Sequence, residues 1–147
     1  MLDPDDQESV PLVGHPVRGY AEGFNIVGLW IRLGVGCLYD AIAYGGLPEG
    51  SDRRFWSATG LLAATPRVDD DRFGDHGGYT PEDLKGFYLT RLLEVAGLPF
   101  ALERPEVICL GHAGALAAVG RARALIDAGR LERVIVLAVD SYLDPMT

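Results

Sequence analysis

The chain has 147 residues, of which 48% are hydrophobic, and a formal net charge of −8. This length suits one domain with a core of its own and is too short for two independent domains, and the hydrophobic content excludes an intrinsically disordered chain. Nucleic acid is not an expected partner, because its phosphates repel an acidic protein. The acidic start excludes a signal peptide, and Arg32 interrupts the longest apolar stretch, so we expect no membrane partner.

The first third of the chain predicts a tail, a helix and a strand. We expect residues 1–9 to be a flexible tail and residues 10–147 to form the domain. Residues 10–13 suit a short edge strand, where proline is tolerated. Across 23–44 the apolar residues recur every three or four positions, which predicts a helix with one broad apolar face. The short apolar run 59–64 is a candidate buried strand.

A polar segment at 66–78 separates this strand from the next helix. Its acids, taken with the three histidines of the chain, raise the question of a metal ion. The residues concerned are Asp69, Asp70, Asp71, Asp75, His15, His76 and His112. Their spacing fits no zinc signature. We therefore expect a solvated acidic loop and no metal site.

The next helix has a clear beginning and end. Thr80 is a suitable N-cap, Pro81 fits the first helical position, and the acids that follow face the positive end of the helix dipole. Gly97 follows the last apolar position and is expected to end this helix. The tryptophans Trp30 and Trp56 are most simply core or interface anchors.

The last third of the chain predicts a strand, a helix and a second strand. The runs 107–110 and 134–139 are apolar without alternation, which is typical of strands buried on both faces. Between them, 113–128 has helical periodicity and so many alanines and glycines that we expect a helix buried at the centre of the fold. The order predicts an α/β fold with a mainly parallel sheet and a right-handed crossover. Ligands of such sheets bind outside the carboxyl ends of the strands, here at the turn 111–114.

The same stretch carries a family resemblance. It is carried by two runs, Gly-His-Ala-Gly-Ala-Leu-Ala-Ala-Val-Gly-Arg-Ala-Arg-Ala-Leu-Ile-Asp-Ala-Gly from Gly111 and Val-Ile-Val-Leu-Ala-Val-Asp-Ser after it. Over 105–141 the chain resembles the β-ketoacyl synthase branch of the thiolase-like superfamily. The resemblance implies the N-terminal half of that fold. The family's nucleophilic cysteine falls on His112, whereas Cys109, three residues earlier, does not match it. Gly111, Gly114 and Ser141 are then candidates for contacting substrate.

The resemblance also implies partners and a substrate class. The family's second half supplies the histidines, or histidine and asparagine, that activate the nucleophile, and this chain matches only the first half. We therefore expect a non-condensing, synthase-like pseudoenzyme that acts in a complex with a second polypeptide, as a homodimer, or both. Its substrates would be acyl-CoA or acyl carrier protein thioesters, and no cofactor is implied. Family dimers pair strands, and 107–110 is the corresponding segment here.

Three other interpretations of the chain remain open. The first is an acyltransferase that is active only when a second half is supplied in trans. The second is a structural α/β interaction module without a ligand. The third is a degenerate α/β-hydrolase, since Gly-His-Ala-Gly also resembles the nucleophile elbow Gly-x-Ser-x-Gly. In that alignment the serine falls on Ala113 and the second glycine on Ala115.

Two further expectations concern cysteines and surface. Cys37 and Cys109 both lie in apolar segments, so we expect small, buried, reduced thiols and a cytoplasmic setting.

If the second half of the fold is supplied by another chain, the sheet face carrying 107–110 and 134–139 is expected to be open. A soluble protein would have to cover such a face with a partner.

Overall fold

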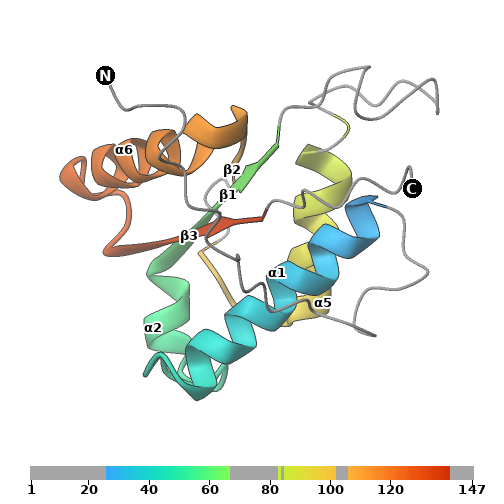
Figure 1. Cartoon of the computed structure of the whole chain (residues 1–147). Coiled ribbons are helices and arrows are strands. Elements are labelled where there is room, and N and C mark those ends of the chain that lie inside the picture. Colours follow the sequence, from blue (N-terminus) through green and yellow to red (C-terminus); the bar gives the residue numbers. More distant parts are fainter. Residues whose placement is uncertain (1–25, 67–82, 84, 102–105, 140–147) are drawn as a thin grey trace, which may run out of the picture.

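The computed structural model describes residues 26–66, 83, 85–101 and 106–139 (Figure 1). In chain order the elements are α1 (Ile26–Ala43), α2 (Arg53–Ser57), β1 (Thr59–Thr65), the π-helical turn η2 (Lys85–Leu89), α5 (Thr90–Ala96), β2 (Glu106–Cys109), the 3₁₀ turn η3 (Gly111–Ala113), α6 (Gly114–Asp127) and β3 (Arg133–Ala138). The expected tail, the edge strand at 10–13, the acidic loop from 67 to 78 and the start of the helix at Thr80 lie outside the described residues, and so does Ser141.

The three strands form one parallel sheet in the order β2-β1-β3. The central strand β1 pairs with both neighbours, with Ala63 opposite Val107 on one side and Leu137 on the other. All seven residues of β1 are buried, which explains its unbroken run of small and apolar side chains. The expected α/β class and the parallel sheet are confirmed. The unit β2–α6–β3 spans β1, so its two strands lie on either side of the central strand.

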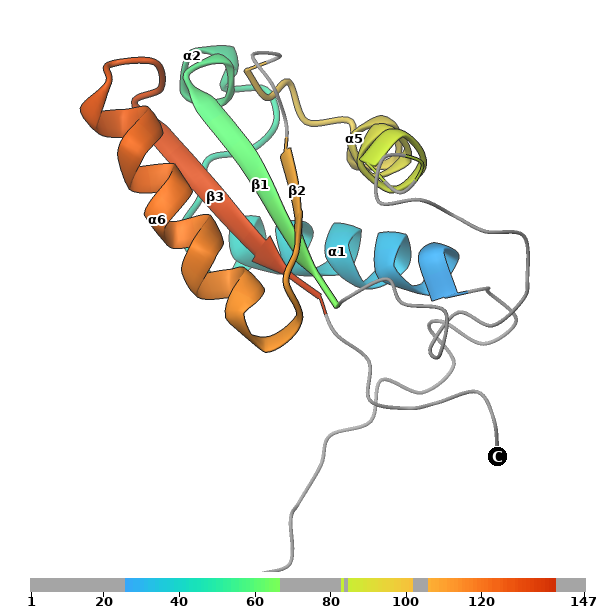
Figure 2. The same ribbon diagram turned by 90° about the horizontal axis from the view of Figure 1, so that it is seen from above.

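Helices cover both faces of this sheet. Figure 2 shows α6 on one side and α1 and α5 on the other. The residues of β1 alternate accordingly, since Leu61 belongs to the core shared with α1 and α5, and Leu62 packs in the cluster under α6. The expectation that one sheet face is open is therefore wrong for this chain. Leu137 and Val107 are buried within the chain itself.

The larger core lies between the sheet and the helices α1 and α5. Trp30 and Trp56 are both buried there, which confirms the expected role of the two tryptophans. The Trp56 ring donates its Nε1–H to the carbonyl of Glu49 at 2.9 Å and meets the ring of Phe100 edge to face at a centroid distance of 5.0 Å. Gly97 ends α5 in the left-handed conformation with φ +61°, as the sequence predicts.

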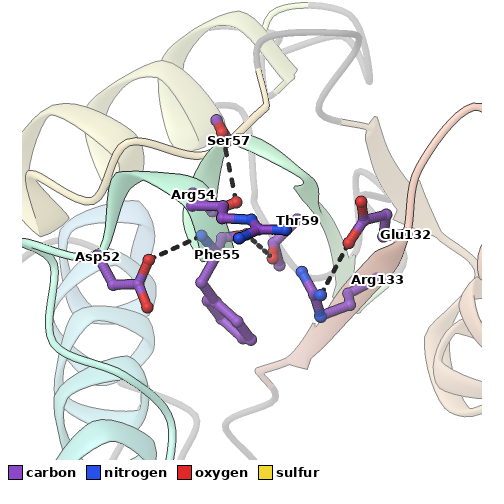
Figure 3. A network of polar contacts seen from close by, with 7 residues as sticks. All are labelled: Asp52, Arg54, Phe55, Ser57, Thr59, Glu132 and Arg133. Atoms are coloured by element: carbon purple, nitrogen blue, oxygen red, sulfur yellow. Dashed lines mark hydrogen bonds and ion pairs between the residues drawn. The ribbon is translucent and has the colours of Figure 1, made fainter.

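A polar network joins α2 to the amino-terminal ends of β1 and β3 (Figure 3). Asp52 caps α2 by accepting the N–H of Phe55 at 3.0 Å. Thr59 donates its hydroxyl to the carbonyl of Phe55 at 2.6 Å, and the Arg133 guanidinium lies 4.8 Å from the Phe55 ring centre. Arg133 also pairs with Glu132 at 2.8 Å. The short helix α2, which the sequence analysis did not predict, thus fixes where both strands begin.

Among the described residues, helix α6 packs on the sheet through one side. The side chains that face the sheet are small, and the buried set is Gly114, Ala118, Ala122 and Leu125. The larger apolar residues Leu116, Val119 and Ile126 are exposed on the other side. The expected helix is confirmed, but in the described residues it forms an outer layer and not a buried centre. None of the described helices is both long and apolar enough to cross a membrane.

Candidate functional site at the carboxyl edge of the sheet

The helices that follow β1 and β2 in the chain lie on opposite faces of the sheet. After β1 the chain continues to η2 and α5, which pack with α1, whereas β2 leads directly into α6 on the other face (Figure 2). Neighbouring parallel strands whose connections diverge in this way leave a crevice outside their carboxyl ends, and that is where open α/β sheets bind ligands. The candidate site is therefore the edge formed by the last residues of β1, the last residues of β2 and the turn into α6.

The turn into α6 needs glycine at its first position. Gly111 has φ +58°, a left-handed conformation that strains residues with a side chain. It opens the 3₁₀ turn η3, which ends when the N–H of Gly114 reaches the carbonyl of Gly111. At Gly114 a Cβ would meet the carbonyl of Ile108 at 3.4 Å and the Ala64 Cβ at 3.5 Å. The start of α6 therefore packs directly on the ends of β1 and β2.

The structure brings three of the four predicted site residues together. Gly111, His112 and Gly114 share this turn at the carboxyl edge, as expected for a ligand-binding βα connection. The main chain of His112 lies in the middle of η3. The predicted roles of these residues in catalysis and substrate contact stay predictions, and Ser141 lies outside the described residues.

A contact that the sequence analysis missed joins the two strand ends. The register pairs Thr65 with Cys109, and the Thr65 hydroxyl oxygen lies 3.2 Å from the Cys109 sulfur. The same hydroxyl lies 3.2 Å from the carbonyl of Pro66. Thr65 is buried, at 3% exposure, and Cys109 is half-buried. The predicted strands 59–64 and 107–110 placed Thr65 and Cys109 within one residue of strand ends, but the register that aligns the two residues depends on the three-dimensional fold.

This contact does not amount to an activated nucleophile. Within the described part of the chain, the Thr65 hydroxyl is the polar side-chain partner of Cys109. A hydroxyl is too weak a base to take the thiol proton at neutral pH, and nucleophilic cysteines need a neighbouring base or cation. The contact is therefore a structural link between the ends of β1 and β2.

The outer side of α6 begins beside this turn and is apolar. The eleven positions from Leu110 to Gly120 carry no Asp, Glu, Lys or Arg. Leu116 is 79% exposed and Val119 is 56% exposed. We call Leu116, Val119 and the flanking Ala113 and Gly120, all of them exposed, the α6 outer face. Large apolar residues gathered on one face of a helix are typical of surfaces that bind another protein.

Charged residues begin only in the second half of α6. Arg121 forms two hydrogen bonds with the Glu106 carboxylate, at 2.9 Å and 2.6 Å, and these bonds raise the pKa of the Arg121 guanidinium. Two residues later, Arg123 pairs with Asp127 at 3.4 Å. Both arginines therefore have acidic partners within the chain, and the α6 outer face itself is apolar.

Comparison with known proteins identifies no relative of this chain. No family model, no curated protein and no solved structure matches it. Among the described residues, no group of three or more histidine, cysteine, aspartate or glutamate side chains is placed to hold a metal ion. The function has therefore to be argued from the carboxyl edge and the α6 outer face.

Proposed function

We propose that the chain is one half of a thiolase-like assembly of the β-ketoacyl synthase type, and that it does not itself carry out condensation. In this proposal His112 stands at the nucleophile position, and the turn 111–114 lines a pocket for an acyl or pantetheine group. A second polypeptide or a second copy covers the α6 outer face and completes the pocket. The substrate would be an acyl-CoA or acyl carrier protein thioester, and the cytoplasm, where thiols remain reduced, would be the setting.

The α6 outer face is the observation that carries this proposal. A helix that belongs to the surface of a single domain has its apolar residues on the side facing the core. Helix α6 has them on both sides, since Ala118 faces the sheet with 0% exposure while Leu116 on the opposite side is 79% exposed. Such a helix suits the middle of a larger assembly. The resemblance over 105–141 implies the same location for the helix that follows the nucleophile position.

The alternatives are supported less well by the site. An acyltransferase completed in trans needs a nucleophile from the partner, because Cys109 has only a threonine hydroxyl beside it among the described residues. The hydrolase elbow requires a strained residue at the nucleophile position, whereas Ala113 has an ordinary conformation with φ −82° and ψ −10°. A structural interaction module would associate in the same way but would have no pocket for an acyl or pantetheine group. Binding of a thioester would therefore favour our proposal over the interaction module.

Association is tested first, with substitutions on the α6 outer face. Sedimentation of the purified chain at micromolar concentration, together with a search for a co-purifying chain, is expected to reveal a complex. The double substitution Leu116→Glu and Val119→Glu should release the chain as a monomer, since two carboxylates cannot be buried without partners. Tyr44→Glu is the matched control, because Tyr44 is exposed directly after α1, on the opposite side of the sheet from α6. A cooperatively melting monomer without any partner would contradict the proposal.

Chemistry is tested second, by intact-mass spectrometry after incubation with acyl thioesters. The chain alone is expected to form no stable acyl adduct, because a histidine without an activating base is a poor acyl nucleophile. The substitution His112→Cys should not by itself create condensation activity, since general acid and base partners would still be missing. An adduct at His112, Cys109 or Ser141 would show that the chain is a catalyst in its own right.

A further inference from the structure

A buried tyrosine hydroxyl lies at the contact between α1 and η2. Tyr88 is 0% exposed, and among the described residues its hydroxyl has no hydrogen-bond partner. The ring meets Trp30 edge to face at a centroid distance of 6.0 Å. The hydroxyl points at Gly34, where a Cβ would stand 3.4 Å from its oxygen. Buried polar groups are nearly always satisfied, so this hydroxyl calls for a specific explanation.

The nearest reactive side chain on α1 is Cys37. It follows Gly34 by three residues, so the two lie next to each other on the same side of the helix. The other groups around Gly34 are the apolar side chains of Leu92 and Leu137. The sequence predicted a buried thiol at this position, and that prediction is wrong, because Cys37 is exposed. Solvent therefore reaches the thiol at the rim of the contact, while the phenol lies inside it.

The Tyr88 hydroxyl stands beside Gly34, and Cys37 follows Gly34 by three residues on the same side of α1, so the phenol and the thiol lie at the same part of the contact. Burial raises the pKa of Tyr88 well above its ordinary value, and the negative charge of a Cys37 thiolate raises it further. The phenol consequently keeps its proton at neutral pH. Among the described residues it is a hydrogen-bond donor without an acceptor, and it stands beside Gly34, three residues before a cysteine that solvent can reach.

We propose that Cys37 is a site of reversible oxidation by peroxides, and that the Tyr88 hydroxyl is the hydrogen-bond donor that receives the product. The Cys37 thiolate attacks one peroxide oxygen, so that an S–O bond forms as the O–O bond breaks. Sulfur is oxidised to the sulfenic acid, and the leaving hydroxide takes up a proton to become water. The added oxygen lengthens the side chain by one atom and supplies the acceptor that Tyr88 lacks. The positioning role of Tyr88 is to hold and protect the sulfenic acid against further oxidation.

The second cysteine provides an internal control. Cys109 is half-buried, and its sulfur already lies beside the Thr65 hydroxyl. Both features slow attack on peroxide, because oxidation depends on access as well as on thiolate character. We therefore expect Cys37 to be oxidised several-fold faster than Cys109 within the same molecule.

The experiment treats the full chain with hydrogen peroxide, traps sulfenic acid with dimedone at intervals, and assigns each label by peptide mass spectrometry. Label is expected mainly at Cys37, and Cys37→Ser should abolish it. In Tyr88→Phe, the Cys37 sulfenic acid should form at the parental rate but pass to the sulfinic acid several-fold sooner. Equal labelling of both cysteines, or an unchanged sulfenic acid lifetime in Tyr88→Phe, would overturn the proposal.

Discussion

The Thr65 hydroxyl oxygen lies 3.2 Å from the Cys109 sulfur and joins the carboxyl ends of β1 and β2. The helices that follow these two strands lie on opposite faces of the sheet, and the contact lies at the carboxyl edge that forms the candidate site. The hydroxyl has one hydrogen for two acceptors, the sulfur and the carbonyl of Pro66. The thiol can donate to the hydroxyl oxygen in return. The pair thus fixes the spacing of the strand ends on which the turn into α6 rests.

The first prediction concerns this pair. Thr65→Val keeps the shape of the side chain but removes the hydroxyl, which leaves the half-buried thiol of Cys109 and the carbonyl of the buried Pro66 with one partner fewer. We expect the free energy of unfolding to fall by about 1 kcal/mol, the usual net value of a buried hydrogen bond. Chemical denaturation of the purified chain measures it. Thr90→Val, at an exposed helical position, should change the stability little, and an equal loss at both sites would contradict the assigned role.

The second prediction concerns the turn at Gly111. Gly111→Ala places a side chain at φ +58° and should destabilise the chain by about 1 kcal/mol, the order of the cost of a left-handed residue. Gly120→Ala is the matched control, because Gly120 lies within α6 with open space around its Cα and alanine favours a helix by about 0.5–1 kcal/mol. The melting temperature should therefore fall in Gly111→Ala and rise in Gly120→Ala. Parallel shifts would mean that the turn relaxes around the new side chain.

Local sequence patterns predicted most of the elements correctly. The helix at 23–44, the strands at 59–64, 107–110 and 134–139, and the helix at 113–128 all occur, within a few residues of their expected ends. Each is long or strongly apolar, so its own residues decide its conformation. Helix α2 was missed because its five residues owe their helical form to the Asp52 cap and to Phe55 packing on Trp56.

The sequence predicted burial less well than conformation. The helix 113–128 was expected to be buried at the centre of the fold, yet its residues Leu116, Val119 and Ile126 are exposed. Helix α6 has two apolar sides, and the side with small residues packs on the sheet because it permits the closer approach. The exposed thiol of Cys37 was misassigned for a related reason. An apolar segment indicates that a helix packs against another part of the protein. Which side of the helix is buried depends on the neighbouring elements of the fold.

The third prediction tests which side of α6 faces the sheet. Ala118→Leu introduces a large side chain where Ala118 is 0% exposed under the sheet, and we expect a loss of about 1–3 kcal/mol from overpacking. Ala124→Leu makes the same change on the same helix at an exposed position, and its effect should stay within about 0.5 kcal/mol. If the two variants unfold at the same denaturant concentration, α6 is not packed through its small residues.

The last prediction concerns Tyr88 and has a neutral and an alkaline part. At neutral pH, Tyr88→Phe removes a buried hydroxyl without a partner among the described residues, so the variant should be more stable by about 1 kcal/mol. For a chain of this size, that gain raises the melting temperature by about 3 °C. Differential scanning calorimetry of both proteins measures the shift. A lower melting temperature in the variant would mean that the hydroxyl has a partner in solution.

The alkaline part follows from the direction of the pKa shift. Burial and the Cys37 charge raise the pKa of Tyr88 in the folded chain, while in the unfolded chain the phenol ionises near pH 10. Above that pH the unfolded state binds fewer protons than the folded state, so the contribution of Tyr88 to stability falls by about 1.4 kcal/mol per pH unit. Phenylalanine does not titrate, and the advantage of Tyr88→Phe over the parent should therefore grow steadily above about pH 10. Tyr44→Phe, an exchange that removes an exposed hydroxyl, is the control for alkaline effects elsewhere in the chain. A constant difference between Tyr88→Phe and the parent across this range would contradict the buried, protonated phenol.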